Sequence, residues 1–119
     1  NGGQLDGARL LKRQTVALMR TNVLATGVKV DTFVPLEGIG FGLDFAIVMD
    51  PVAFGSSSGR NTFYWGGAFG TWFWIDPTND VIVVGMIQNV NASVPDGGSP
   101  PLRVLSQKLV YQALSDRTK

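Results

Sequence analysis

The segment from Phe63 to Pro77 holds the residues with the clearest potential for chemistry. A glycine pair, Gly66-Gly67, stands there among aromatic side chains, inside what reads as a long strand. Glycine weakens a strand interior, so a pair at this point indicates that another group approaches the main chain closely. An oxyanion held by main-chain N–H groups is one such group. Trp65-Gly66-Gly67-Ala68 is therefore a candidate oxyanion site, and the alternative is a bulged strand packed under an aromatic cluster.

The other groups of a familiar nucleophilic site are absent from the sequence. Its 119 residues include no histidine and no cysteine, which excludes a Ser-His-Asp or Cys-His triad, a disulfide and a thiolate zinc site. The nine acidic residues are scattered, and no cofactor is expected. A net charge of +1 without a basic stripe argues against nucleic acid as a partner. No apolar run is long enough to span a bilayer, and the cellular compartment stays open.

The composition fits one domain or a piece of one. Apolar residues make up 45% of the chain, which is enough to build a core. The opening Asn1-Gly2-Gly3 resembles the residues that follow the last turn of a helix. The alternatives are a flexible tail and a chain that begins just after a helix, and we expect the second.

The first third of the sequence predicts a hairpin, a short helix and an irregular connection. Asp6-Gly7 between apolar residues is typical of a two-residue hairpin turn. Apolar side chains at spacings of three and four predict a helix from Lys12 to Thr21. Residues 22–37 contain Gly27 and Pro35, which interrupt regular structure.

Three strand candidates follow. Alternating apolar residues predict strands over residues 39–49 and 62–75, and an apolar run predicts a third over residues 81–89. The serine- and glycine-rich segment 52–61 is expected to be a flexible loop. Asp76-Pro77-Thr78-Asn79-Asp80 is typical of a turn between the second and third strands.

The closing segment predicts a helix over about residues 101–115, capped by Ser99 with Pro100 at its start. Its apolar stripe, expected to lie across the sheet, consists of Leu102, Leu105, Leu109, Val110, Ala113 and Leu114. The fold class is therefore α+β, an antiparallel sheet of about three strands packed against a C-terminal helix. The continuously apolar residues 81–84 are typical of a central strand covered on both faces. The second face of the sheet nevertheless has little in this chain to cover it.

The ordered set of these segments resembles the C-terminal portion of the serine β-lactamase-like hydrolases, the superfamily of class C β-lactamases, DD-peptidases and related serine esterases. The resemblance covers nearly the whole chain, in residues 1–11, 40–43 (Gly-Phe-Gly-Leu), 65–67, 70–80 and 109–114. It implies that residues 1–38 are the remnant of a helical region and its connection to the sheet. Residues 39–119 would then be the C-terminal part of the sheet domain.

By this resemblance, Trp65-Gly66-Gly67 is the family's third active-site motif, in the Trp-Gly-Gly form of the esterase-like branch. The Ala68 N–H would point into the oxyanion hole as one of its two donors. Tyr64 and Phe69 would border the substrate pocket. Trp65 stands where penicillin-recognising members hold a substrate carboxylate with cationic or hydroxylic groups. The resemblance therefore implies a serine esterase or amidase rather than a β-lactamase or DD-peptidase.

The family's other two motifs are missing from this chain. No serine has lysine three residues later, so Ser-x-x-Lys is absent. Neither Tyr64 nor Tyr111 is followed by asparagine two residues later. The nucleophile and its lysine are therefore expected on an N-terminal segment of the same hydrolase, on a separate or cleaved chain, with a small ester, amide or β-lactam as substrate. This chain alone is expected to be inactive.

Two non-catalytic functions stay open. Tyr64, Trp72 and Trp74 are candidates for an aromatic face that binds a glycan or a protein, although core packing is the commoner use of such residues. The chain is also a candidate for completing the sheet of a partner by strand pairing.

Overall fold

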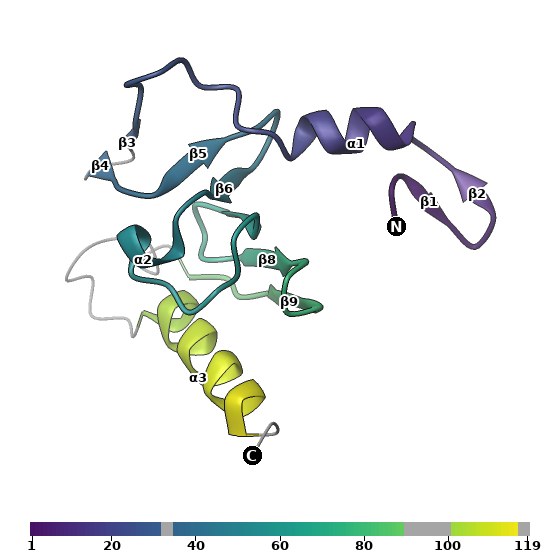
Figure 1. Cartoon of the computed structure of the whole chain (residues 1–119). Coiled ribbons are helices and arrows are strands. Elements are labelled where there is room, and N and C mark those ends of the chain that lie inside the picture. Colours follow the sequence, from purple (N-terminus) through teal and green to yellow (C-terminus); the bar gives the residue numbers. More distant parts are fainter. Residues whose placement is uncertain (32–34, 90–100, 117–119) are drawn as a thin grey trace.

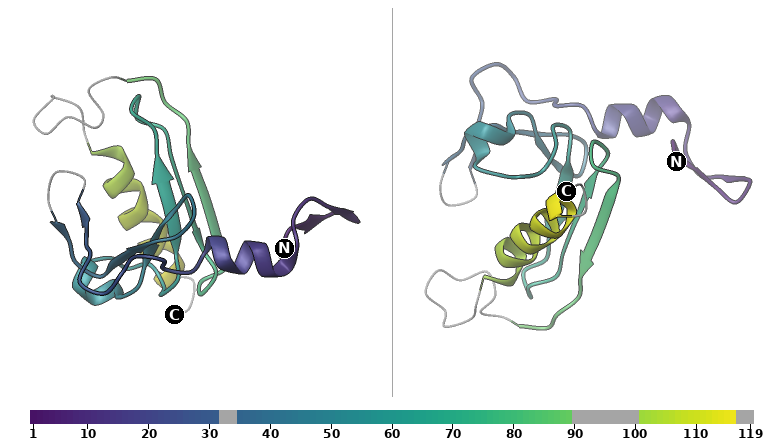
Figure 2. Two further views of the ribbon diagram at one scale, coloured as in Figure 1. Left: turned by 90° about the horizontal axis from the view of Figure 1, so that it is seen from above. Right: turned by 60° about the horizontal axis from the view of Figure 1, so that its bottom comes forward.

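The computed structural model describes residues 1–31, 35–89 and 101–116 and confirms the predicted α+β class (Figure 1). Its main feature is an antiparallel sheet with strand order β5-β6-β7-β8-β9. These strands are β5 (Ile39–Phe41), β6 (Ala46–Val48), β7 (Phe63–Gly66), β8 (Trp72–Asp76) and β9 (Val81–Gly85). Helix α3 (Leu102–Asp116) lies along one face of the sheet, whereas α1 (Arg13–Met19) extends beyond the other (Figure 2).

The N-terminal segment forms the predicted hairpin and helix. Strand β1 (Gln4–Leu5) pairs with β2 (Ala8–Arg9), and between them Asp6 and Gly7 have φ angles of 49° and 82°. Two left-handed residues in succession suit the right-handed twist of the strands. The segment expected to be irregular contains a further small pair, β3 (Val30–Asp31) with β4 (Pro35–Leu36).

The prediction of one strand over residues 39–49 is wrong, because the chain reverses in its middle. The Gly42 N–H donates to the Phe45 carbonyl at 2.8 Å and closes a turn between β5 and β6. A Cβ on residue 42 would lie 2.0 Å from the Met19 carbonyl oxygen, so glycine is required there. The turn thus packs against the end of α1, a tertiary contact that residue alternation does not reveal.

The prediction of one strand over residues 62–75 is wrong for a similar reason. Strand β7 ends at Gly66, and the Gly70 N–H donates to the Gly67 carbonyl at 3.1 Å in a four-residue turn. Gly70 has a φ of 92°, which favours glycine. The chain then enters β8, which pairs with β7 on one side and β9 on the other. The predicted turn after β8 is confirmed at residues 77–80.

Part of the segment expected to be a flexible loop is the short helix α2 (Pro51–Phe54). Asp50 caps this helix, accepting hydrogen bonds from the Val52 and Ala53 N–H groups at 3.0 Å. Proline in the first turn and the left-handed Gly55 at the end are its sequence signals. The Asp50-Pro51 pair that follows β6 therefore starts the helix α2.

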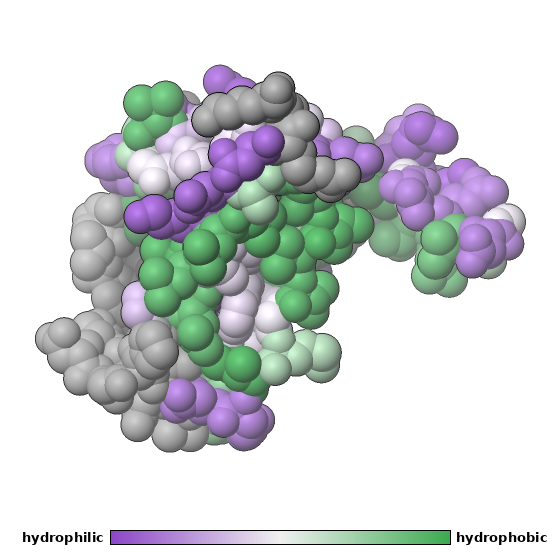
Figure 3. Space-filling model, turned by 90° about the horizontal axis from the view of Figure 1, so that it is seen from below, coloured by the Kyte–Doolittle hydropathy of each residue, from purple (hydrophilic) through white to green (hydrophobic). Residues whose placement is uncertain are grey.

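Among the described residues, β9 is the last strand of the sheet rather than a central one. The prediction that residues 81–84 are covered on both faces is also wrong for the described part of the chain. Val83 packs toward α3, but Ile82 is 71% exposed and Val84 is 63% exposed on the opposite face. Met86 is exposed as well. On this face Phe45 and Arg20 pack on Phe63, and the part at Ile82, Val84 and Met86 is uncovered among the described residues, as expected. Figure 3 shows hydrophobic residues gathered across the middle of the molecule, beside the hydrophilic N-terminal segment.

The predicted C-terminal helix is confirmed as α3, but its buried face differs from the predicted one. Leu102, Leu105 and Leu109 are exposed, the last of them at 63%. Tyr111 is buried instead, and Val110 and Leu114 pack beside it. The proposed cap, Ser99-Pro100, lies outside the described residues. No helix in the described ranges combines the length and the hydropathy that crossing a membrane requires.

The buried carboxylate of Asp76 joins α3 to the end of the sheet. Asp76 has no exposed surface, and its Oδ2 accepts hydrogen bonds from the Tyr111 hydroxyl at 2.6 Å and the Gly59 N–H at 2.7 Å. The same oxygen accepts from Asn79 Nδ2, and Oδ1 accepts from the N–H groups of Thr78 and Asn79. Burial raises the pKa of Asp76, but these hydrogen bonds outweigh it and hold the pKa below its usual value.

We expect Asp76 to make stability depend on acidic pH. Because its folded-state pKa is lowered, the carboxylate stabilises the fold fully above the unfolded-state pKa of about 3.9, and this contribution disappears as the pH falls through the folded-state pKa. Urea unfolding at a series of pH values checks this. Asp76→Asn should flatten the acidic part of the curve, and an unchanged curve would contradict the assignment.

Tyr111→Phe tests the same connection with a smaller change. Loss of a hydrogen bond to a charged acceptor should lower the free energy of unfolding by about 1.5–3 kcal/mol. Gln112→Ala, on the exposed neighbouring position of α3, is the control and should change it by less than about 0.5 kcal/mol.

Candidate functional site

The Trp-Gly-Gly segment lies at the end of β7 and in the turn that follows. Trp65 pairs with Phe73 of β8, and Gly66 pairs with Trp72. The Gly67 N–H donates to the Thr71 carbonyl at 2.8 Å, which makes this the next hydrogen-bonded pair of the ladder. The candidate residues are thus held on a β-hairpin rather than in the middle of a strand.

One edge of this segment lies open among the described residues. Pairing between β6 and β7 consists of Ala46↔Tyr64 and Ile47↔Phe63 and stops there. Because Gly67 bonds to β8, strand alternation directs the main-chain groups of Gly66 toward the other edge, beyond the last pair with β6. Open main-chain donors at a strand edge are what an oxyanion site requires.

Ala68 occupies the second position of the turn, directly beyond this edge. It is exposed, and Phe69 beside it is 51% exposed. No acceptor among the described residues takes a hydrogen bond from the Ala68 N–H. The donor predicted from the sequence is therefore available in the described part of the chain, and its role in an oxyanion hole stays a prediction.

A shallow apolar groove of about 360 Å³ runs beside the hairpin. Its lining includes Trp65, Gly66 and Gly67 together with Val84 and Met86. The structure thus brings three of the predicted site residues into one groove. The Trp65 ring also meets Phe41 of β5 edge-on, with 5.1 Å between ring centroids.

Tyr64 lies apart from these residues. Strand alternation places it on the α3 side of the sheet, where its ring stacks on Phe54 with 6.0 Å between centroids. Burial raises the pKa of Tyr64 to about 12, against an opposing effect of the Arg103 guanidinium. Tyr64 therefore packs between α2 and α3, and the predicted pocket role for it stays a prediction.

Arg103 is a residue near the site that the sequence reasoning missed. Its guanidinium lies over Gly66, where a Cβ would be 2.2 Å from Nη2. Arg103 comes from the first turn of α3, almost forty residues after the motif, so only the packing of the helix brings the two together. No spacing signal within the motif points to it.

Trp72 and Trp74 are core residues. They are 8% and 2% exposed, and they pack against Tyr111 and Val110 of α3. A Cβ on Gly85 would lie 2.2 Å from the Trp72 ring, which explains the glycine in β9. Buried rings offer no face for a sugar, so Trp72 and Trp74 do not form the aromatic platform suggested as an alternative.

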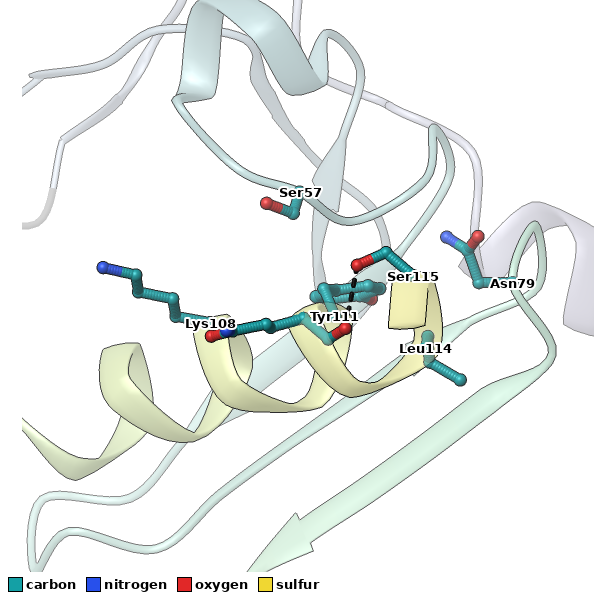
Figure 4. Close-up of a pocket in the computed structure, with 7 residues that line it drawn as sticks. Ser57, Asn79, Lys108, Tyr111, Leu114 and Ser115 are labelled. Carbon is teal, nitrogen blue, oxygen red and sulfur yellow. Dashed lines mark hydrogen bonds between the residues drawn. The ribbon is translucent and has the colours of Figure 1, made fainter. Parts of the chain in front are cut away.

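A second depression, of about 720 Å³, lies near the other end of α3. Figure 4 shows Ser57 and Lys108 on different walls of this depression, the first from the loop after α2 and the second from α3. The Ser115 hydroxyl donates to the Gln112 carbonyl of its own helix. The polar side chains that line this depression do not converge on one point. Among the described residues, no three acidic side chains gather as a metal site.

The burial of the tryptophans predicts their response to an aqueous quencher. Trp65 is 40% exposed, so acrylamide should quench mainly its emission. Trp65→Phe should remove most of the quenchable fluorescence, whereas the matched variant Trp74→Phe should retain it. Titration with chito-oligosaccharides should leave the emission unchanged. A sugar-dependent shift that persists in Trp65→Phe would restore the aromatic platform.

Comparison with known proteins relates the fold to a hydrolase. No protein-family model matches the chain. Two Mycobacterium tuberculosis proteins, Protein Rv1367c of strain H37Rv and the uncharacterized protein MT1414 of strain CDC 1551, are each 38% identical to it, over 87% of this chain. The chain spans only 28% of the length of these relatives. The chain also resembles the solved structure of EstCE1, "a hydrolase with promiscuous acyltransferase activity", with a TM-score of 0.55 and 29% sequence identity. The match covers 70% of this chain and 20% of EstCE1.

Proposed function

We propose that this chain is the C-terminal portion of a β-lactamase-like serine hydrolase that cleaves ester or amide bonds. The observation that carries the proposal is the open edge of β7 at Gly66, continued by the exposed Ala68 N–H in a closed turn. The chain would supply the third active-site motif and one oxyanion donor. The similarity to EstCE1, a hydrolase, supports a hydrolytic function.

The proposed chemistry is acyl transfer to water through a serine ester. A serine Oγ from another segment attacks the carbonyl carbon, and the carbonyl oxygen gains the negative charge. The Ala68 N–H donates a hydrogen bond to this oxyanion, together with a second donor outside this chain. Collapse of the intermediate expels the alcohol or amine with a proton, and water then releases the acid from the acyl-enzyme.

The turn suits this task because its own hydrogen bonds fix it before substrate arrives. The Gly67 N–H is tied to the Thr71 carbonyl and the Gly70 N–H to the Gly67 carbonyl. A donor held in advance costs no reorganisation when charge develops. The apolar groove beside Gly66 and Gly67 would hold the non-polar part of an ester.

The chain by itself should not form an acyl-enzyme. None of its serines has lysine three residues later, and no base accompanies Ser56, Ser57 or Ser58. Incubation with a fluorophosphonate probe, followed by intact mass measurement, should leave the mass unchanged, and p-nitrophenyl esters should hydrolyse at the buffer rate. A covalent adduct on any serine would contradict this prediction.

Ala68→Pro tests the oxyanion assignment in a polypeptide that joins this segment to the nucleophile-bearing segment. Proline removes the N–H but suits the second position of a four-residue turn, so the hairpin should persist. We expect kcat to fall by about 10²–10³. Ala68→Gly, which keeps the N–H, is the control and should stay near the parental value. Full kcat in Ala68→Pro with an intact fold would overturn the assignment.

A further inference from the structure

The Arg103 guanidinium occupies the space that a side chain at position 66 would need. A Cβ on Gly66 would lie 2.2 Å from Nη2, 2.5 Å from Cζ and 2.8 Å from Nη1 of Arg103. Real Cβ atoms do not approach other heavy atoms this closely, so a side chain at position 66 would displace the guanidinium, which is the far end of an exposed, flexible side chain. On the α3 side of the sheet, Gly66 therefore leaves room for an internal contact.

Arg103 also reaches the other strand of the hairpin. Its Nη2 lies 3.4 Å from the Thr71 carbonyl oxygen, to which it donates a long hydrogen bond. The same oxygen accepts the Gly67 N–H at 2.8 Å. A single side chain from α3 thus contacts both strands at the base of the Gly67–Gly70 turn.

Two of the four turn residues are glycines, and one main-chain contact reaches the turn from outside the hairpin, where the Asn89 N–H donates to the Phe69 carbonyl at 2.8 Å. Gly67 and Gly70 have no side chains, and Ala68 and Phe69 are exposed. The hydrogen bonds Gly67 N–H to Thr71 and Gly70 N–H to Gly67 hold the turn from within. Arg103 adds a contact from outside the hairpin, at the end opposite the Asp76–Tyr111 hydrogen bond.

We propose that Arg103 is a positioning residue that braces the β7–β8 hairpin from α3, and that Gly66 is glycine to admit it. The brace stands on the contacts of this chain alone. Its consequence for catalysis, a fixed Ala68 N–H, rests on the proposed function. The two parts are therefore tested by separate measurements.

Amide hydrogen exchange of this chain tests the brace without any activity. Arg103→Met should speed exchange of the Gly67 and Gly70 N–H groups by about 2- to 10-fold, the effect of one net hydrogen bond. The internal reference is the Val48 N–H of β6, which donates to the Thr62 carbonyl, and its exchange rate should not change. Lys108→Met, which removes an exposed cation from α3, is the matched control and should match the parent at all three amides.

Gly66→Ala should produce the same acceleration, because its Cβ displaces the guanidinium. The double variant Gly66→Ala, Arg103→Met should then exchange no faster than either single variant, since both remove one contact. Additive effects, or unchanged exchange in Arg103→Met, would overturn the brace. Arg103→Lys keeps the positive charge but lacks the planar guanidinium that contacts both strands. In this variant the Gly67 and Gly70 N–H groups should therefore exchange as fast as in Arg103→Met.

Kinetics of the joined polypeptide test the consequence. Arg103→Met should lower kcat for a neutral p-nitrophenyl ester while KM stays within about 2-fold, because the transition-state donor loses its position. Loss confined to esters that carry a carboxylate, with neutral esters unaffected, would make Arg103 a substrate ligand and overturn the positioning role. If Ala68→Pro retains full kcat while the exchange results hold, the proposed function fails and the brace survives.

Discussion

The fold depends on a carboxylate buried without exposed surface at the end of β8. A charge in that position is unfavourable unless donors surround it, and Asp76 has five, from the turn after β8, the loop after α2 and the Tyr111 hydroxyl. Three segments far apart in the sequence therefore meet at one side chain. This explains why α3 packs through Tyr111, although its leucines form the more obvious apolar stripe.

The candidate site lies at the other end of the same hairpin. Asp76 anchors the end of β8, and the chain between Gly66 and Gly70 makes its turn near the start of that strand. Two glycines of the neighbouring strands leave room for other side chains and are not present for backbone flexibility alone. Gly66 lies against Arg103, and Gly85 lies against the Trp72 ring. Through Arg103, the packing of α3 across the sheet thus reaches the base of the turn that contains Ala68.

Local signals in the sequence predicted the elements that short-range contacts decide. Asp6-Gly7, the turn after Asp76 and the existence of α3 follow from residues a few positions apart. The chain reversals at Gly42 and at Gly67–Gly70 could not be predicted in this way, because the alternation of apolar residues continues through them. The first reversal is set by a contact with α1 and the second by hydrogen bonds within the hairpin. The sequence pointed to Trp65-Gly66-Gly67-Ala68, which lie on the β7–β8 hairpin, and their role stays a prediction. Arg103 reaches this hairpin only through tertiary packing, which spacing along the chain does not encode.

Helix α3, on one side of the sheet, carries exposed leucines, and the sheet carries the exposed Ile82, Val84 and Met86. A helix and a sheet that both expose apolar side chains resemble the inner layers of a larger domain, in which further layers cover such surfaces. A molecule that covers either side would stabilise the folded state, and the free energy of unfolding would then rise with the concentration of that molecule. The free energy of unfolding would then report the binding of that covering molecule together with the fold.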